Sequence, residues 1–184
     1  KELNSIVSNK THFFSNTSSL SIKMLAKYYK YPINFFGMHF FNPAFQNKLI
    51  ELVYCHERQK QALEPYKVML ESLNKKVIIV NDSPGFIVNR LLLIQINEAC
   101  EILEGLDTTA SEIDLAYRTA TNSLQGPFQR ADLIGNDIVL LMLENLLKET
   151  GNKKFSPNQI LKTMVNENRL GRKTLNGFYT YESN

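Results

Sequence analysis

Short apolar runs alternate with segments of helical period in the first part of the chain. Four runs are rich in β-branched and aromatic residues, which is typical of strands: residues 11–15, 34–40, 48–54 and 76–80. Two segments between them repeat apolar residues at steps of three and four, which is typical of helices: residues 18–29 and 62–73. Pro65 indicates a kink in the second helix or a late start. Strands that alternate with helices predict an α/β layer with at least some parallel strands.

From Pro84 onward the pattern is helical throughout. Residues 86–104 are apolar nearly all round, which predicts a helix buried on every face that ends before Gly105. Local signals predict helices in three further places: after a capping box at residues 109–112, over residues 137–149 before Gly151, and after an N-cap at Ser156. Residues 172–181 mix charged and aromatic side chains, and we expect them to pack back on the helices as a C-terminal strap.

The change of pattern at Pro84-Gly85 predicts a boundary between two regions, residues 1–83 and residues 84–184. Four strands form a short sheet with exposed edges, which fits part of a domain better than a whole one. The chain also starts at Lys1 without an initiating Met. We therefore expect a piece of a longer protein.

Composition narrows the class of protein. With 43% apolar and 21% charged residues among 184, the chain is globular rather than disordered. No apolar run approaches the roughly 20 residues that span a bilayer, and a net charge of +3 is far from a nucleic-acid footprint. The two cysteines, Cys55 and Cys100, form no C-x-x-C pattern, and the three histidines do not join them at zinc-ligand spacing. We expect reduced thiols, a cytosol-like compartment, no metal and no membrane partner.

The eight glycines form neither G-x-G-x-x-G nor a Walker A loop in this sequence. The 184 residues therefore carry no phosphate-cradling glycine loop.

Three polar features are candidates for chemistry. His39 ends a strand-like run, and Glu51 lies twelve residues further on in the next strand. A carboxylate beside a histidine can fix its tautomer for general-base work, although a lone histidine among phenylalanines is also typical of a packed core residue. Asn89 lies among apolar neighbours, so it either caps local backbone or faces a ligand. The polar residues 15–19 fit a helix N-cap as well as a binding loop.

Six ordered motifs resemble one known family. They are Ser15–Leu20, Gly37–Pro43, Lys48–Glu51, Asp82–Leu91, Gly126–Phe128 with Asp132–Gly135, and Leu170–Thr174 with Gly177–Tyr179. These motifs occur in this order in the L-3-hydroxyacyl-CoA dehydrogenases, and the resemblance covers residues 11–181. A related group that acts on sugar acids carries Pro where this chain has Phe40-Phe41, so the phenylalanine pair indicates an acyl-CoA substrate.

The resemblance implies a Rossmann NAD-binding domain followed by an all-α domain like the C-terminal domain of 6-phosphogluconate dehydrogenase. On this basis residues 1–83 are the C-terminal part of the α/β Rossmann domain, lacking most of it, including its glycine-rich loop. Residues 84–184 are then the helical domain that binds acyl-CoA and forms a homodimer. The implied activity is the NAD-dependent oxidation of (S)-3-hydroxyacyl-CoA to 3-oxoacyl-CoA, in fatty-acid β-oxidation or butanoate metabolism. The implied location is the cytoplasm, or the mitochondrial matrix in a eukaryote.

The resemblance also assigns roles to individual residues. His39 matches the base that takes the proton of the 3-hydroxyl group, and Glu51 matches the carboxylate that orients it. Asn89 and Ser18 match residues that hold the 3-oxygen and the thioester region. The resemblance further implies that Asn42 contacts the substrate. It also implies that Asn16 and Ser18 both contact the cofactor.

Two segments depart from the family pattern. Phe45-Gln46-Asn47 replaces a Pro-Val-Met-like stretch, and Ser123-Leu124-Gln125 replaces a segment with a Pro-Met pair. Both changes concern the acyl pocket or the packing of the domains, so they affect the expected preference for acyl-chain length rather than the expected chemistry. Two alternatives to a dehydrogenase remain open from sequence: a non-catalytic helical dimerisation module, and a truncated chain that needs a separate NAD domain.

Overall fold

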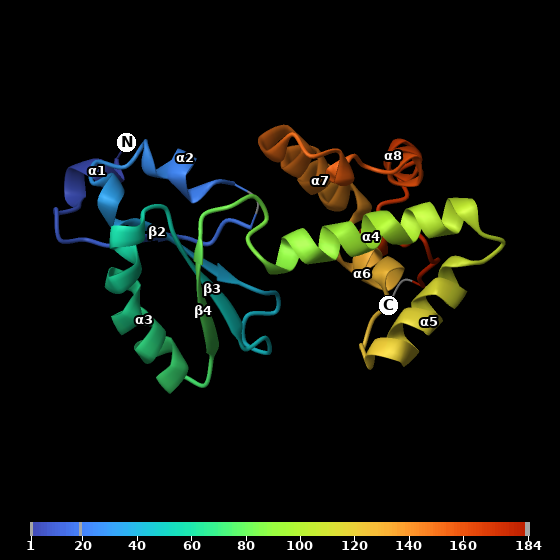
Figure 1. Ribbon diagram of the computed structural model, residues 1–184, viewed down its shortest axis with the longest axis horizontal. Coiled ribbons are helices and arrows are strands. Elements are labelled where there is room, and N and C mark those ends of the chain that lie inside the picture. The colour runs from blue at the N-terminus through green and yellow to red at the C-terminus, as the bar shows by residue number, and fades with distance from the viewer. Residues whose placement is uncertain (1, 19, 183–184) are drawn as a thin grey trace. The chain divides into compact units, whose positions relative to one another are not determined.

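The computed structural model describes residues 2–18 and 20–182. The chain divides into two compact units, Lys1–Ile87 and Val88–Asn184. Figure 1 shows strands only in the first unit, whereas the second is built of helices. The pattern of the sequence therefore predicted correctly an α/β segment followed by an all-helical one.

The first unit contains a four-stranded mixed sheet in the order β1-β2-β3-β4. Its strands are β1 (Phe13–Ser15), β2 (Phe35–Phe40), β3 (Leu49–Tyr54) and β4 (Lys76–Asn81). β1 runs parallel to β2 and β3 runs parallel to β4, whereas β2 and β3 are antiparallel. All four strands fall where the sequence predicts them, and the expectation of some parallel pairs is confirmed.

Helices cover both faces of this sheet. The unit contains α1 (Leu3–Ile6), α2 (Ile22–Ala26) and α3 (Lys60–Ser72), with 3₁₀ turns at Pro32–Asn34 and Glu57–Gln59. Successive strand residues point to opposite faces, so Phe36 and Leu52 pack in the cluster with α3, while Phe35 and Val53 pack in the cluster with α2. Pro65 lies inside α3, five residues after its start, so the late start proposed for this helix is wrong.

The helix expected over residues 18–29 is shorter than predicted. α2 starts after Ser21, whose Oγ accepts a hydrogen bond from the Met24 amide at 3.2 Å. The Asp82 carboxylate also accepts from Ser21 Oγ and from the Lys23 amide, both at 2.8 Å. These contacts place the N-cap at Ser21, outside the 15–19 segment that could have supplied it; Ser19 itself lies outside the described residues.

The second unit is a helical bundle. Its helices are α4 (Val88–Gly105), α5 (Ala110–Thr121), α6 (Pro127–Ile134), α7 (Asn136–Thr150) and α8 (Gln159–Asn166), with 3₁₀ turns at Lys153–Phe155 and Arg172–Thr174. The capping box of Thr109 and Glu112 and the left-handed C-cap at Gly151 are confirmed. The sequence did not predict α6, and α8 is capped by Asn158 rather than Ser156.

The start and burial of α4 also differ from expectation. Residues 84–87 form a turn in which Gly85 and Phe86 have φ of 71° and 47°, so the helix begins at Val88 and includes Gly105. Leu91 is 58% exposed, so the helix is not buried on every face. A sequence that is apolar nearly all round therefore leaves part of its apolar surface uncovered in the described chain.

A buried carboxylate of α5 caps α6. Asp114 accepts hydrogen bonds from the backbone amides of Phe128 and Gln129, both at 2.9 Å. The N-cap residue of α6 is Gly126, which has no side chain that could accept hydrogen bonds from these amides. A Cβ on Gly126 would lie 2.3 Å from the Asp114 carboxyl carbon, so only glycine leaves room for the carboxylate.

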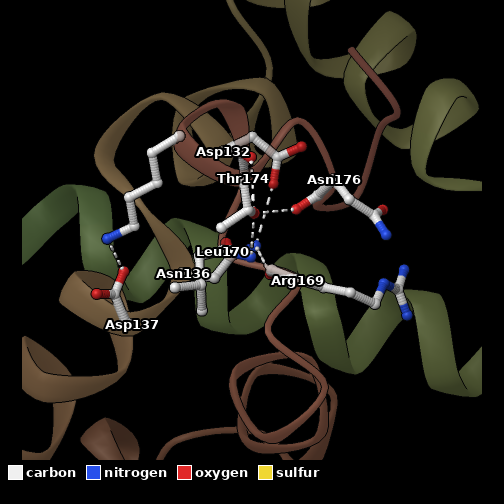
Figure 2. A network of polar contacts seen from close by, with 9 residues as sticks. Asp132, Asn136, Asp137, Arg169, Leu170, Thr174 and Asn176 are labelled. Carbon is white, nitrogen blue, oxygen red and sulfur yellow. Dashed lines mark hydrogen bonds and ion pairs between the residues drawn. The ribbon is translucent and has the colours of Figure 1, made fainter.

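A second buried carboxylate anchors the C-terminal strap. Asp132 accepts from the amides of Phe178 and Tyr179, from the Tyr181 hydroxyl, each at 3.0 Å, and from the Asn136 side chain at 3.1 Å. Figure 2 shows Asp132 and Asn136 beside the turn of the strap that contains Thr174. The strap also packs the Phe178 ring 4.3 Å from that of Phe128. The expectation that residues 172–181 pack back on the helices is confirmed.

Candidate active site

A buried histidine–carboxylate pair lies on neighbouring strands of the first unit. His39 of β2 is directly opposite Glu51 of β3 in the antiparallel register, so both side chains leave the same face of the sheet. His39 Nδ1 and Glu51 Oε2 are 2.7 Å apart, and the two residues are 4% and 0% exposed. The spacing of twelve residues in the sequence therefore corresponds to one direct cross-strand pair.

The surroundings of Glu51 fix the orientation of the imidazole. Its second oxygen, Oε1, accepts a hydrogen bond from the Ile87 amide at 3.1 Å. Because an ionised carboxylate can only accept, the Nδ1 of a neutral His39 carries the hydrogen and Nε2 keeps its lone pair. The imidazole also contacts Phe41 and Phe86, with ring centroids 4.4 and 5.7 Å away. A histidine held in this way can serve as a general base.

Three of the remaining candidates follow the ends of β1 and β2. Asn16 comes directly after β1, and its Oδ1 accepts from the Phe40 amide at 3.0 Å, which ties the ends of the two strands together. Ser18 lies two residues further on and is half-buried. Asn42 lies in the exposed loop after β2, where its carbonyl accepts from the Asn47 side chain at 2.7 Å, and a cis peptide bond joins it to Pro43. In open α/β sheets, ligands bind outside the carboxyl ends of such parallel strands.

The side chains after β1 present polar groups near the end of the strand. The exposed Asn16 Nδ2 makes no hydrogen bond within residues 2–18 and 20–182, so it can donate to solvent or to a ligand. His39 and the carboxyl ends of β1 and β2 thus all belong to the first unit. Asn89, by contrast, is the second residue of α4 and belongs to the other unit.

The sequence did not identify two residues that contact the histidine–carboxylate pair. Phe86 and Ile87 were expected inside a helix, but they lie in the turn before α4, where Phe86 contacts His39 and Ile87 donates to Glu51. The signal for this was the Pro84-Gly85 pair, since a turn there prevents the helix from starting at Phe86. The turn thus supplies part of the environment of the pair of His39 and Glu51.

Neither cysteine has the character of a nucleophile. Burial raises the pKa of Cys55 to about 11 and that of Cys100 to about 12. Thiols with a raised pKa are largely protonated near neutral pH and react slowly. Among the described residues, no group of three or more His, Cys, Asp or Glu is arranged to hold a metal ion, and no helix has the length and apolarity to cross a membrane.

Comparison with known proteins identifies two family regions. Residues 1–83 match the family model of the 3-hydroxyacyl-CoA dehydrogenase NAD binding domain, and residues 85–181 match that of the C-terminal domain. Sequence from both domains is therefore present, which corrects the expectation of a chain that lacks most of the NAD-binding domain. The two matches are to domains of one dehydrogenase family, and they extend over both regions of the chain rather than over the helical region alone.

Individual relatives agree with the family match. The chain is 40% identical to a 3-hydroxybutyryl-CoA dehydrogenase of Clostridioides difficile, covering 98% of this chain and 64% of the relative. It is 35% identical to a mitochondrial hydroxyacyl-coenzyme A dehydrogenase of Sus scrofa, covering 99% and 58%. The solved (S)-3-hydroxybutyryl-CoA dehydrogenase of Ralstonia eutropha superposes with a TM-score of 0.91 at 36% identity, covering 100% of this chain and 65% of that one. The chain thus spans less than two thirds of the length of these relatives.

Proposed function

Since the chain belongs to the 3-hydroxyacyl-CoA dehydrogenase family, we propose that the whole protein oxidises (S)-3-hydroxyacyl-CoA to 3-oxoacyl-CoA with NAD. The observation that carries this proposal is the buried pair of His39 and Glu51, with Nδ1 and Oε2 at 2.7 Å. An alcohol can lose hydride from its carbon only as its hydroxyl proton leaves, and this pair provides the base for that proton. The family match supplies the class of substrate.

In the proposed mechanism His39 accepts the 3-hydroxyl proton at Nε2. Glu51 then stabilises the imidazolium that forms, and the Ile87 amide keeps the carboxylate in place. NAD, held in part by Asn16 and Ser18, would supply the acceptor for the hydride that leaves C3, so the substrate would lose one proton and one hydride in total. The phenylalanine rings around His39 restrict water at the base.

The other candidates receive binding roles in this proposal. Asn89 and Ser18 hold the 3-oxygen and the thioester region, Asn42 contacts the substrate, and Asn16 with Ser18 contacts the cofactor. Residues 1–83 serve as part of the Rossmann NAD-binding domain, and residues 84–184 serve as the acyl-CoA-binding and dimerisation domain. Because no glycine-rich loop occurs in these 184 residues, we expect this segment alone to bind NAD weakly.

Turnover of acetoacetyl-CoA by the intact protein tests the function directly. We expect acetoacetyl-CoA to be consumed with a stoichiometric loss of NADH. The absorbance of NADH measures this loss. The reaction should run in reverse with (S)-3-hydroxybutyryl-CoA and NAD. Absence of NAD(H)-linked turnover in both directions would count against a dehydrogenase and in favour of a non-catalytic module.

We further propose that the protein is a homodimer that associates through the helical unit. Ile138 and Leu141 of α7 lie one helical turn apart and are 40% and 50% exposed, and Leu133 of α6 is 51% exposed. Apolar side chains grouped on a surface favour association. Sedimentation at tens of micromolar should show a dimer, and Leu141→Lys should shift it towards the monomer. The matched control Glu144→Lys changes an exposed polar residue of the same helix, and an equal shift there would contradict the role of Leu141.

The state of the two cysteines is informative about the cellular compartment of the protein. Cys55 and Cys100 are both free, and burial of the thiols raises their pKa. Free thiols are typical of reducing compartments. We propose the cytoplasm, or the mitochondrial matrix in a eukaryote.

A further inference from the structure

A cavity of about 280 Å³ lies in the helical unit between α4, α5 and α6. Five residues of α4 line it at helical spacing: Val88, Leu91, Leu92, Gln95 and Ile96. From Val88 to Ile96 this wall spans eight residue steps, or about 12 Å at 1.5 Å per step. The volume falls just below the roughly 300–1,000 Å³ of pockets that hold a whole drug-sized ligand, so it suits one part of a larger molecule.

The wall starts beside a residue with a proposed role in substrate binding. Asn89 directly follows Val88 on α4, and we propose above that it holds, together with Ser18, the 3-oxygen and the thioester region of the substrate. An acyl chain that leaves the thioester along α4 would meet Leu92 and then Ile96, one and two helical turns further on. The cavity is therefore placed to receive the distal part of an acyl chain.

The opposite side of the cavity carries a single charge. Arg130 of α6 is the only charged residue among the described residues that line it, and the apolar Pro127 lies one turn before it. Arg130 is half-buried, and its guanidinium forms no hydrogen bond or ion pair within the described parts of the chain. The nearby acid of α5, Asp114, is already engaged by the Phe128 and Gln129 amides and by the Tyr179 hydroxyl.

The half-buried Arg130 guanidinium has no anionic partner on the otherwise uncharged wall of the cavity. Arginine binds carboxylates through two parallel hydrogen bonds, and it is rarely taken out of water without such a partner. Neutral polar groups complete the rim, where the Tyr117 hydroxyl donates to the Gln95 Oε1 at 3.2 Å. The lining therefore suits a chain that is apolar along its length and anionic at its end.

We infer that this cavity binds the tail of an acyl-CoA that ends in a carboxylate, with Arg130 as the residue that selects it. The inference rests on the proposed function, because it uses the acyl-CoA substrate and the role of Asn89. It narrows the substrate class to 3-hydroxyacyl-CoA esters of dicarboxylic acids of medium length. A neutral tail of the same length would fill the apolar wall and leave the guanidinium unpaired.

The test compares two six-carbon substrates in the complete protein: 3-hydroxyadipyl-CoA, which ends in a carboxylate, and 3-hydroxyhexanoyl-CoA, which ends in a methyl group. We expect kcat/KM to favour the carboxylate by about tenfold or more, as a charge-assisted hydrogen-bonded pair would produce. Arg130→Leu should bring the ratio to one or below, and Arg130→Lys should keep it above one. The readout is a ratio, so a general loss of activity cancels. Arg118→Leu, on the exposed side of α5, is the matched control and should leave the ratio unchanged.

Binding separates this inference from the proposed function. Calorimetric titration with adipyl-CoA and hexanoyl-CoA, which lack the 3-hydroxyl group, should show the same preference and the same loss in Arg130→Leu. If the preference in binding persists while 3-hydroxybutyryl-CoA is not oxidised, the proposed reaction fails and the carboxylate site stands. Equal binding of the two esters, or a preference that survives Arg130→Leu, overturns the inference. Conversion of the protein into a monomer by Arg130→Leu would also overturn it, because the cavity would then be a subunit interface.

Discussion

His39→Gln in the complete protein should lower kcat by about 10²- to 10⁴-fold, with a much smaller effect on KM. Glutamine keeps the size and polarity of the side chain but cannot accept the 3-hydroxyl proton. The loss corresponds to about 3 to 5 kcal/mol of activation free energy. Steady-state kinetics with acetoacetyl-CoA and NADH measures it, and His56→Gln, at an exposed histidine, is the control that should leave kcat unchanged.

The partner variant distinguishes a base from a packed core histidine. Glu51→Gln removes the charge that stabilises the imidazolium but keeps a group of the same shape opposite Nδ1. Residues that act as one unit have non-additive effects, so the double variant should be little slower than His39→Gln alone. Near-wild-type kcat in His39→Gln, with a folded protein, would return His39 to the role of a packed core residue.

Asp132→Ala should lower the free energy of unfolding of the helical unit by about 3 kcal/mol or more. The carboxylate is 1% exposed and accepts four hydrogen bonds, so its removal leaves the Phe178 and Tyr179 amides without their partner. Urea unfolding followed by far-ultraviolet circular dichroism measures the loss, since the chain has no tryptophan. An unchanged midpoint would show that Asp132 does not anchor the strap.

A surface carboxylate of the same region serves as the control. Asp137, which Figure 2 shows at the edge of the network, pairs with Lys173, and the side chains of Asp137 and Lys173 are 32% and 45% exposed. Exposed pairs contribute about 0–1 kcal/mol, so Asp137→Ala should change the unfolding midpoint little. Tyrosine absorbance gives a second readout: burial, with the adjacent Asp132 carboxylate, raises the pKa of Tyr181 to about 12, and Asp132→Ala should lower it towards the usual value.

The sequence predicts the strands and the capped start of α5 well because each of them depends on residues that are close together in the chain. The strands follow from β-branched and aromatic runs, and the start of α5 follows from the capping box of Thr109 and Glu112. The proximity of His39 and Glu51 could be anticipated because adjacent strands separated by a short connection tend to pair. Their roles came from the ordered family motifs rather than from spacing, which fits a core histidine equally well.

Features that depend on distant residues could not be predicted. Gly126 gives no local sign of a helix cap, because its cap is the Asp114 carboxylate from another helix. The start of α2 is set in part by Asp82, which lies 61 residues from Ser21. The exposed Leu91 and the charged wall of the cavity depend on which faces the bundle covers, and no periodicity in α4 alone specifies this.

The antiparallel pairing of β2 and β3 has a consequence for how the base is assembled during folding. His39 and Glu51 are twelve residues apart and are joined by one hairpin connection, so bringing them together closes only a short loop. Contacts of low sequence separation form quickly, whereas the parallel pairs of this sheet need crossovers and form more slowly. A slip of one residue in this hairpin would turn Glu51 to the opposite face and separate the pair. The parallel pairing of β3 with β4 along all six residues of each strand prevents such a slip once the sheet is complete. We therefore expect the hairpin to bring His39 and Glu51 together before the parallel strands pair, and the pairing of β3 with β4 to fix their register in the completed sheet.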